Sequence, residues 1–146
     1  MRKIAGTAMA IWMWASSSAL AADSVVSVSA GWILAAPPTA HAFAGYMTID
    51  SIGTEPARIV GVTSPAFSRI EIHESRQEDG MMRMRALPEL RIAGGERLAL
   101  QPGGVHLMLM DPKASLRLGD TVTVRVIIDG GESIDVLLTV RLDPDS

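Results

Sequence analysis

The strongest constraint on the fold is an alternation of apolar and polar residues with period two along most of the chain. It is clearest near the C-terminus, where Val122, Val124, Val126 and Ile128 alternate with polar residues. Successive side chains of a β-strand point to opposite faces of a sheet, so this pattern predicts strands with one buried face. No segment beyond the N-terminal region carries the apolar stripe of an amphipathic helix, and parallel α/β folds are excluded because they need crossover helices.

Turn residues divide the alternating segments into short strands. Gly, Pro, Asp and Ser clusters, such as Asp79-Gly80 and Asp129 to Gly131, separate them at spacings typical of an antiparallel sandwich or barrel. We therefore predict a single all-β domain, an antiparallel β-sandwich. The expected strands are Val25 to Ile33, Ala42 to Asp50, Ala57 to Thr63, Phe67 to Glu74, Met81 to Leu87, Arg97 to Gln101, Val105 to Met110, Thr121 to Ile128 and Ser133 to Arg141.

The N-terminus has the pattern of a secretory signal peptide. Arg2 and Lys3 precede an apolar run from Ile4 to Trp14, and small residues follow up to Ala19-Leu20-Ala21. This predicts a removed signal peptide over residues 1–21 and a mature domain over 22–146. The apolar run is about half the roughly 20 residues that a spanning helix needs, so no stable membrane insertion is expected. The protein is expected in the periplasm, or outside the cell if the source has no outer membrane.

Composition removes several classes of function. The chain has no cysteine, which excludes disulfides, thiolate metal sites, iron–sulfur clusters, thiol nucleophiles and a cysteine-linked lipid anchor. Its 13 Lys and Arg are scattered among 16 Asp and Glu, so nothing indicates nucleic-acid binding. No catalytic motif stands out, and an enzyme using His106 with Glu71, Glu74 or Asp111 is the least supported reading.

Histidine and methionine concentrate in one expected strand near residue 106. His106 and Met108 are two residues apart, so both side chains project from the same face, and Met110 continues the row. Two ligands for one metal ion can therefore come from this strand.

A second His and Met pair flanks an expected hairpin. A four-residue loop, Gln77 to Gly80, would place His73 directly opposite Met84, whereas a two-residue loop, Asp79-Gly80, would leave them diagonal neighbours. Both alternatives keep the two side chains within reach of one another.

Two imidazoles and two thioethers form a soft, uncharged set of metal ligands. Thioethers favour Cu(I), whereas calcium and magnesium prefer oxygen ligands and zinc prefers Cys or carboxylate beside His. Met81 and Met84 have opposite parity, so at least one of them is expected to pack, and Met82 and Met110 are the best substitute ligands.

From about Val25 to Arg141 the chain resembles the periplasmic copper chaperone family written PCuAC, whose pattern is H-x10-M-x21-H-x-M. The residues at those spacings are His73, Met84, His106 and Met108. The resemblance implies a cupredoxin-like, Greek-key β-sandwich that binds one Cu(I) per chain and is not an enzyme. It implies transfer to an acceptor such as a respiratory oxidase subunit or another copper chaperone, and we expect a monomer.

A second hypothesis needs no metal. In it the chain is an exported β-sandwich that binds another protein, and its methionines are core or interface packing. His41 is expected to be an ordinary surface residue, with an auxiliary Cu(II) site formed with the new amino terminus at Ala22 as the alternative. Trp32 and Tyr46 are expected to pack the sandwich.

Overall fold

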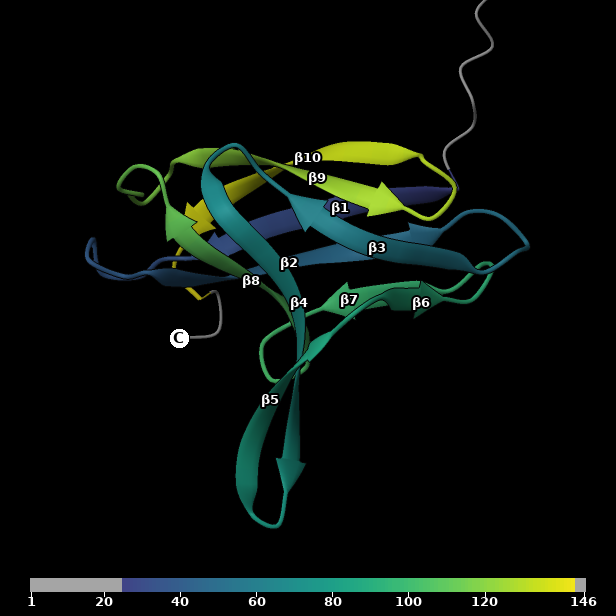
Figure 1. Ribbon diagram of the computed structural model, residues 1–146, viewed down its shortest axis with the longest axis horizontal. Coiled ribbons are helices and arrows are strands. Elements are labelled where there is room, and N and C mark those ends of the chain that lie inside the picture. Colours follow the sequence, from purple (N-terminus) through teal and green to yellow (C-terminus); the bar gives the residue numbers. More distant parts are fainter. Residues whose placement is uncertain (1–24, 144–146) are drawn as a thin grey trace, which may run out of the picture.

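The computed structural model describes residues 25–143, and these form ten β-strands without a helix (Figure 1). None of the described residues therefore forms a helix long and apolar enough to cross a bilayer. The predicted signal peptide and its cleavage site lie outside the described residues. The strands are β1 (Val26–Leu34), β2 (Ala42–Ser51), β3 (Ala57–Thr63), β4 (Phe67–Glu78), β5 (Met81–Leu87), β6 (Leu90–Ile92), β7 (Arg97–Leu100), β8 (Val105–Pro112), β9 (Thr121–Ile128) and β10 (Ser133–Arg141).

The all-β prediction is confirmed, and each of the nine expected strands is present. Two details differ. β4 continues four residues beyond the expected end at Glu74, to Glu78. The three-residue strand β6 was not predicted, because three residues are too few to display an alternation.

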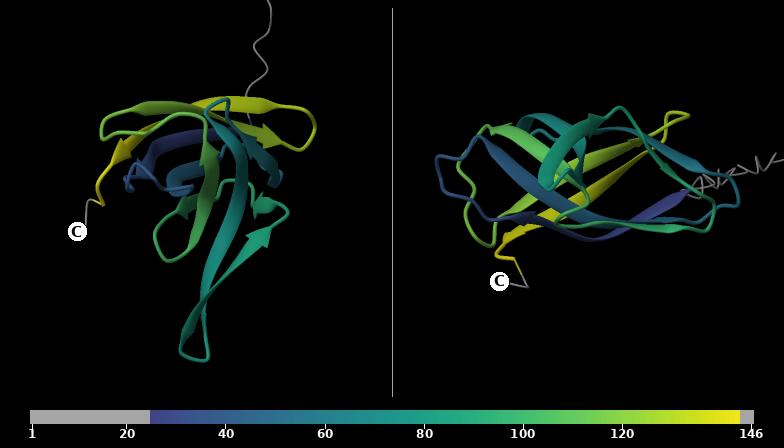
Figure 2. Two further views of the ribbon diagram at one scale, coloured as in Figure 1. Left: turned by 60° about the vertical axis from the view of Figure 1, so that its left-hand side comes forward. Right: turned by 90° about the horizontal axis from the view of Figure 1, so that it is seen from below.

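Nine of the strands form one continuous path of paired neighbours, in the order β5-β4-β8-β2-β1-β10-β9-β3-β6, and β7 also pairs with β2. The path folds back on itself to form the body of the molecule (Figure 2). One pair, β1 with β10, is parallel, which departs from a purely antiparallel arrangement. These strands come from opposite ends of the domain, so no hairpin turn imposes an antiparallel direction on them.

The core lies between the inward faces of the folded sheet. β9 follows the predicted alternation, with Val122, Val124, Val126 and Ile128 buried, and β2 and β8 contribute from across the core. The largest side chains that are fully buried are Ile33, Met47, Ile49, Ile59, Ile92, Leu107, Leu109, Ile128 and Leu138.

A β-bulge in β1 changes which residues face the core. The register with β2 shifts between Ser29 and Trp32, and Ala30 has a positive φ of 52°. Val28 packs against the core before the bulge, whereas Ile33 does so after it. Trp32 is consequently buried on the opposite, outer face of the sheet, outside the core cluster.

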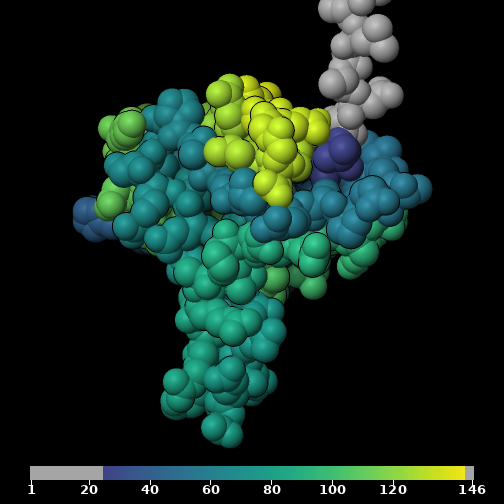
Figure 3. Space-filling model, turned by 45° about the vertical axis from the view of Figure 1, so that its right-hand side comes forward, coloured from purple at the N-terminus to yellow at the C-terminus, as the bar shows by residue number. Residues whose placement is uncertain are grey.

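The β4–β5 hairpin projects from the body as an arm. β4 pairs with β8 only as far as Glu74; beyond it, residues 75–84 form a two-stranded hairpin, here named the arm. Asp79 and Gly80 make its turn, both with positive φ (51° and 76°), as expected of a two-residue hairpin turn. Figures 1 and 3 show the arm standing clear of the sandwich.

Gly94, between β6 and β7, is expected to be intolerant of substitution. A Cβ atom built there would lie 2.1 Å from the carbonyl oxygen of Thr54, a backbone atom that cannot rotate away. Gly94→Ala should lower the free energy of unfolding by about 2 kcal/mol in urea denaturation. Gly53→Ala is the matched control, because its Cβ would meet only the Glu55 nitrogen, at 3.9 Å. Equal effects from the two variants would contradict this account.

Candidate metal centre

The two candidate histidine ligands of the sheet face each other across adjacent strands. His73 of β4 pairs directly with His106 of β8. Their side chains leave the outer face of the sheet, and the ring centroids are 6.0 Å apart. This contact joins residues 33 positions apart in the chain, and it depends on the β4–β8 pairing rather than on a local turn.

His106 is held in place by the loop that precedes β8. Its side chain is buried, with the residue 4% exposed, and its Nδ1 atom lies 3.1 Å from the carbonyl oxygen of Gly104. A carbonyl can only accept, so Nδ1 carries a proton, and in the neutral ring Nε2 keeps its lone pair. The same carbonyl also accepts a hydrogen bond from the backbone nitrogen of Ser75 at 3.1 Å, which joins the loop to the base of the arm.

His73 is held by a carboxylate on its own strand. Its Nε2 atom lies 2.8 Å from Oε2 of Glu71, and Arg69 contacts the other oxygen of Glu71 at 3.0 Å. The hydrogen bond from His73 lowers the pKa of Glu71, burial opposes this, and the nearby charge of Arg69 lowers the pKa further. The other ring nitrogen of His73, Nδ1, is buried and has no hydrogen-bond partner. Such an atom is costly to bury unless a ligand satisfies it.

Met108 lies beside this histidine pair. It is two residues from His106 on the same face of β8, is partly buried, and pairs with Glu71 on one side and Ala44 on the other. Met110 continues the row as expected, two residues beyond Met108 and farther from the histidines. Its sulfur lies 2.9 Å from the guanidinium of Arg69.

Met84 is the ligand candidate that the fold does not bring into contact. The observed two-residue turn pairs Met84 with Ser75, so the four-residue loop is wrong and Met84 is a diagonal neighbour of His73 on the same face. Its residue is 62% exposed on the arm. The residue opposite it, Ser75, is small and buried.

The other methionines of the arm are also exposed. Met82 shares the face of Met84 but lies opposite Gln77, farther from His73, and Met81 projects from the other face. None of the three packs in the core, so the expectation that Met81 or Met84 packs there is wrong, whereas packing of these methionines against another protein stays a prediction. Met47, which is 2% exposed, is a true core methionine.

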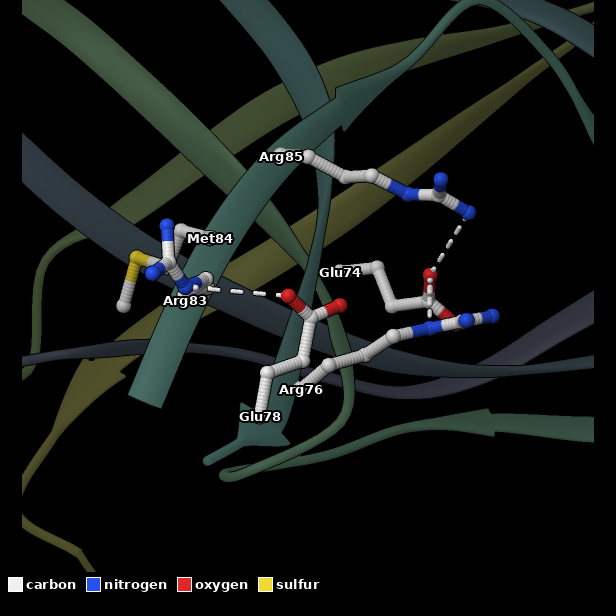
Figure 4. Close-up of a pocket in the computed structure, with 6 residues that line it drawn as sticks. All are labelled: Glu74, Arg76, Glu78, Arg83, Met84 and Arg85. Atoms are coloured by element: carbon white, nitrogen blue, oxygen red, sulfur yellow. Dashed lines mark hydrogen bonds and ion pairs between the residues drawn. The ribbon is translucent and has the colours of Figure 1, made fainter. Parts of the chain in front are cut away.

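The second face, opposite the one that carries Met84, has ion pairs in the arm and at its base. Glu74 contacts Arg76 at 2.8 Å and Arg85 at 3.3 Å, and Glu78 contacts Arg83 at 3.6 Å. The hydrogen bond from Arg76 is the main cause that lowers the pKa of Glu74. Figure 4 shows these side chains lining a shallow hollow with Met84 at its edge.

The separation of the two histidine rings is within the reach of a single metal ion. A metal about 2 Å from each imidazole nitrogen, the usual distance, can join rings whose centres are up to roughly 6 Å apart. The observed separation of 6.0 Å meets this condition, and Met108 and Met84 lie to either side of the pair. Within residues 25–143 no three His, Asp or Glu side chains gather as a metal site.

An aromatic row continues from the site across the outer face. The Tyr46 ring lies 6.5 Å from that of His106 and 4.6 Å from that of Trp32, and the Arg141 guanidinium stacks over Trp32 at 4.5 Å. Burial, and then the charge of Asp143, raises the pKa of Tyr46. Trp32 and Tyr46 are packing residues as expected, although on the outer face rather than in the core.

His41 lies away from this site. It is exposed before β2, with its Nδ1 3.9 Å from Asp111. His41 directly precedes the first residue of β2. Val26, near the start of the described chain, pairs with Ser51 at the last residue of β2, so it lies at the other end of that strand from His41.

Comparison with known proteins places the chain in a family. The sequence model described as "LpqE-like: Putative lipoprotein LpqE-like" matches residues 26–140. The chain belongs to the LpqE-like family. It is 35% identical over 117 residues to the putative lipoprotein Lxx21020 of Leifsonia xyli, covering 80% of this chain and 69% of that protein. It is 27% identical over 102 residues to the uncharacterized protein RP573 of Rickettsia prowazekii, covering 69% of this chain and 55% of that protein.

Solved structures similar to this LpqE-like chain include DR1885 and domains described as PCuAC. The apo form of DR1885 from Deinococcus radiodurans is 29% identical, with a TM-score of 0.65, covering 100% of this chain and 98% of that chain. Its Cu(I) form, also 29% identical, has a TM-score of 0.64 and covers 82% and 78%. The copper-bound PCuAC domain of PmoF2, 17% identical, has a TM-score of 0.70 and covers 82% and 95%. The resemblance to PCuAC proteins and the β-sandwich fold predicted from sequence are confirmed.

Two features of this LpqE-like site were not predicted. Glu71 was considered as a partner of His106, but it contacts His73 instead. The spacing of Glu71 and His73, two residues apart in a strand, was the available signal, because it places both on one face. The Gly104 carbonyl carries no side-chain signal, and its role follows only from the three-dimensional structure.

Proposed function

We propose that this protein is an exported copper chaperone that binds one Cu(I) through His73, Met84, His106 and Met108 and transfers it to an acceptor protein. The observation that carries the proposal is the facing pair of His73 and His106, in which each ring keeps one nitrogen free of hydrogen bonds within the described chain. A relative of known structure, DR1885, is described in a Cu(I) form and is 29% identical over most of both chains.

The donor set favours Cu(I) over other biological metals. Imidazole nitrogens and thioether sulfurs are neutral and soft, and Cu(I) accepts both, whereas calcium and magnesium require oxygen ligands. Met84 is on the exposed arm, so an approaching ligand can replace it without unfolding the sheet. Transfer would proceed by stepwise exchange, in which ligands of the acceptor displace Met84 first and the buried His106 last.

The acceptor and the compartment follow from the same proposal. A respiratory oxidase subunit or a second copper chaperone is the acceptor that the PCuAC resemblance suggests, and we propose a monomeric carrier in the periplasm. Export would use the signal peptide at residues 1–21. The Leifsonia relative is named a putative lipoprotein, but this sequence has no cysteine to carry a thioether-linked lipid.

A substitution at His106 tests the proposal. His106→Leu should lower Cu(I) affinity at least 100-fold, more than is typical of losing an outer-shell partner, in an anaerobic competition with a colorimetric chelator at pH 7. The fold should survive, because leucine fills the buried site and the Gly104 carbonyl still accepts from Ser75.

His41→Leu is the matched control for this titration. His41 is highly exposed and lies outside the histidine pair, so its loss should leave a one-to-one Cu(I) complex unchanged. Failure of the folded wild-type protein to compete with the chelator would overturn the copper proposal. Equal loss in the two variants would overturn the assigned site.

The exposed methionines of the arm favour one other function. Met81, Met82 and Met84 are 58%, 59% and 62% exposed, and exposed apolar groups on a projecting hairpin suit a protein-binding surface. In that case the methionines would contribute packing to a partner and copper would not be needed.

A further inference from the structure

We infer that the two histidines bind copper through different ring nitrogens, His73 through Nδ1 and His106 through Nε2, and that Glu71 is the positioning residue that imposes this choice on His73. The inference rests on the proposed function, since it concerns how the same site holds its ion.

Hydrogen bonding assigns the proton on each ring. The Glu71 carboxylate only accepts, so the 2.8 Å contact requires a proton on Nε2 of His73, and in the neutral ring Nδ1 then has a lone pair. The Gly104 carbonyl also only accepts, so Nδ1 of His106 is protonated and its Nε2 is bare. The neighbouring imidazoles are therefore opposite tautomers, each presenting one bare nitrogen.

The surroundings of His73 make the reverse arrangement unfavourable. Binding through Nε2 would break the bond to Glu71, whose carboxylate is fixed from the other side by Arg69 at 3.0 Å. It would also leave Nδ1, already buried without a partner, unsatisfied in the copper complex. Binding through Nδ1 keeps the Arg69–Glu71–His73 chain intact and satisfies the orphaned atom. A carboxylate on the far nitrogen of a metal-bound histidine is a common way to orient that ligand.

The choice of nitrogen also determines where the metal lies. Nδ1 is bonded to the ring carbon nearest the backbone, whereas Nε2 is at the far side of the ring. Copper held by Nδ1 of His73 and Nε2 of His106 would therefore lie closer to β4 than to β8. β5, which carries Met84, is the other neighbour of β4. The tautomers thus bring the ion toward the one ligand that is only a diagonal neighbour of His73.

Nitrogen-15 NMR of the histidine rings tests the inference on the chain from Ala22 onward, which contains all ten strands. In metal-free protein the unprotonated nitrogen should be Nδ1 in His73 and Nε2 in His106. One equivalent of Cu(I), added without oxygen, should shift those same two nitrogens.

Variants at Glu71 separate a positioning role from a merely structural one. Glu71→Leu should abolish the tautomer preference of His73 and lower Cu(I) affinity about 10- to 100-fold, the range for loss of an outer-shell partner. Glu71→Gln, whose amide oxygen can still accept from Nε2, should restore most of the tautomer preference of His73 and most of the Cu(I) affinity. Glu74→Leu is the control, because Glu74 is on the same strand but the opposite face, paired with Arg76 and Arg85.

The outcomes distinguish this inference from the proposed function. If Nε2 of His73 is the unprotonated nitrogen in the metal-free protein, or is the nitrogen that Cu(I) shifts, the inference is wrong. The protein would then still be a copper carrier, with His73 binding through Nε2. An unchanged tautomer in Glu71→Leu would overturn the role of Glu71. Absence of any histidine shift with Cu(I) would overturn the copper proposal itself, and the inference with it.

Discussion

Replacing Met84 and Met108 together by leucine is expected to lower Cu(I) affinity at least 1000-fold, beyond the 10- to 100-fold typical of an outer-shell change. Leucine cannot donate a sulfur lone pair, and the two histidines alone leave Cu(I) without its soft ligands. Leucine nearly conserves the volume of methionine, and Met84 is 62% exposed, so the melting temperature of the metal-free protein should barely change. Anaerobic competition with a chelator and a thermal melt measure the two effects.

Met81→Leu is the matched control for the methionine pair. Met81 lies on the same strand with similar exposure, but it projects from the opposite face of the arm. Unchanged affinity in the double variant would contradict the ligand assignment, and a loss only when Met82 or Met110 is also replaced would identify the substitute ligand. If the protein is instead a metal-free binding module, the leucine variants should retain partner binding, because the apolar surface is preserved.

Leu109→Ala is expected to lower the free energy of unfolding by about 3 to 4 kcal/mol, within the range for a leucine deleted from a tight core. Leu109 is completely buried in β8, between Phe43 of β2 and Ile70 of β4 in the ladder. Its Cδ1 atom is also close to Gly45, where an added Cβ would be only 2.7 Å away. Urea denaturation of the metal-free protein measures the loss.

The control for this core substitution is Leu137→Ala in β10, where the leucine is 65% exposed and a change below about 0.5 kcal/mol is expected. Leu109 points away from the face that carries Met108, so the folded Leu109→Ala protein should bind Cu(I) as the wild type does. A loss of less than about 1 kcal/mol would mean that the core is not packed around Leu109 as described.

Strand prediction succeeded where the alternation is long and unbroken. β9 and β10 have the expected bounds and a buried face because valine, isoleucine or leucine recurs at every second position over eight and nine residues. Prediction failed at β6, which is too short to show a period, and at the bulge in β1, where Ala30 reverses the face that later residues present. A bulge cannot be recognised from periodicity alone, because it interrupts the period itself.

The register of the β4–β5 hairpin was likewise predicted only in part from the sequence. The sequence admitted two loops, and the positive φ angles of Asp79 and Gly80 belong to the shorter one. The four-residue loop would have placed Met84 opposite His73, whereas the observed turn places Met84 opposite Ser75 and Ala86 opposite His73. Local chemistry therefore predicted a hairpin with both ligands on one face, but the turn geometry decided how far apart they lie.

The sequence by itself determined the all-β fold, the candidate ligand residues and the faces on which they project, because period two is a local property of an extended backbone. It placed His106 and Met108 on one face without knowledge of their neighbours. Only the tertiary structure decided that His73 faces His106, since pairing between β4 and β8 depends on the burial of a core shared by distant segments. The partners of the two rings, Glu71 and the Gly104 carbonyl, follow from that packing. They select the nitrogen that each histidine can offer to a metal.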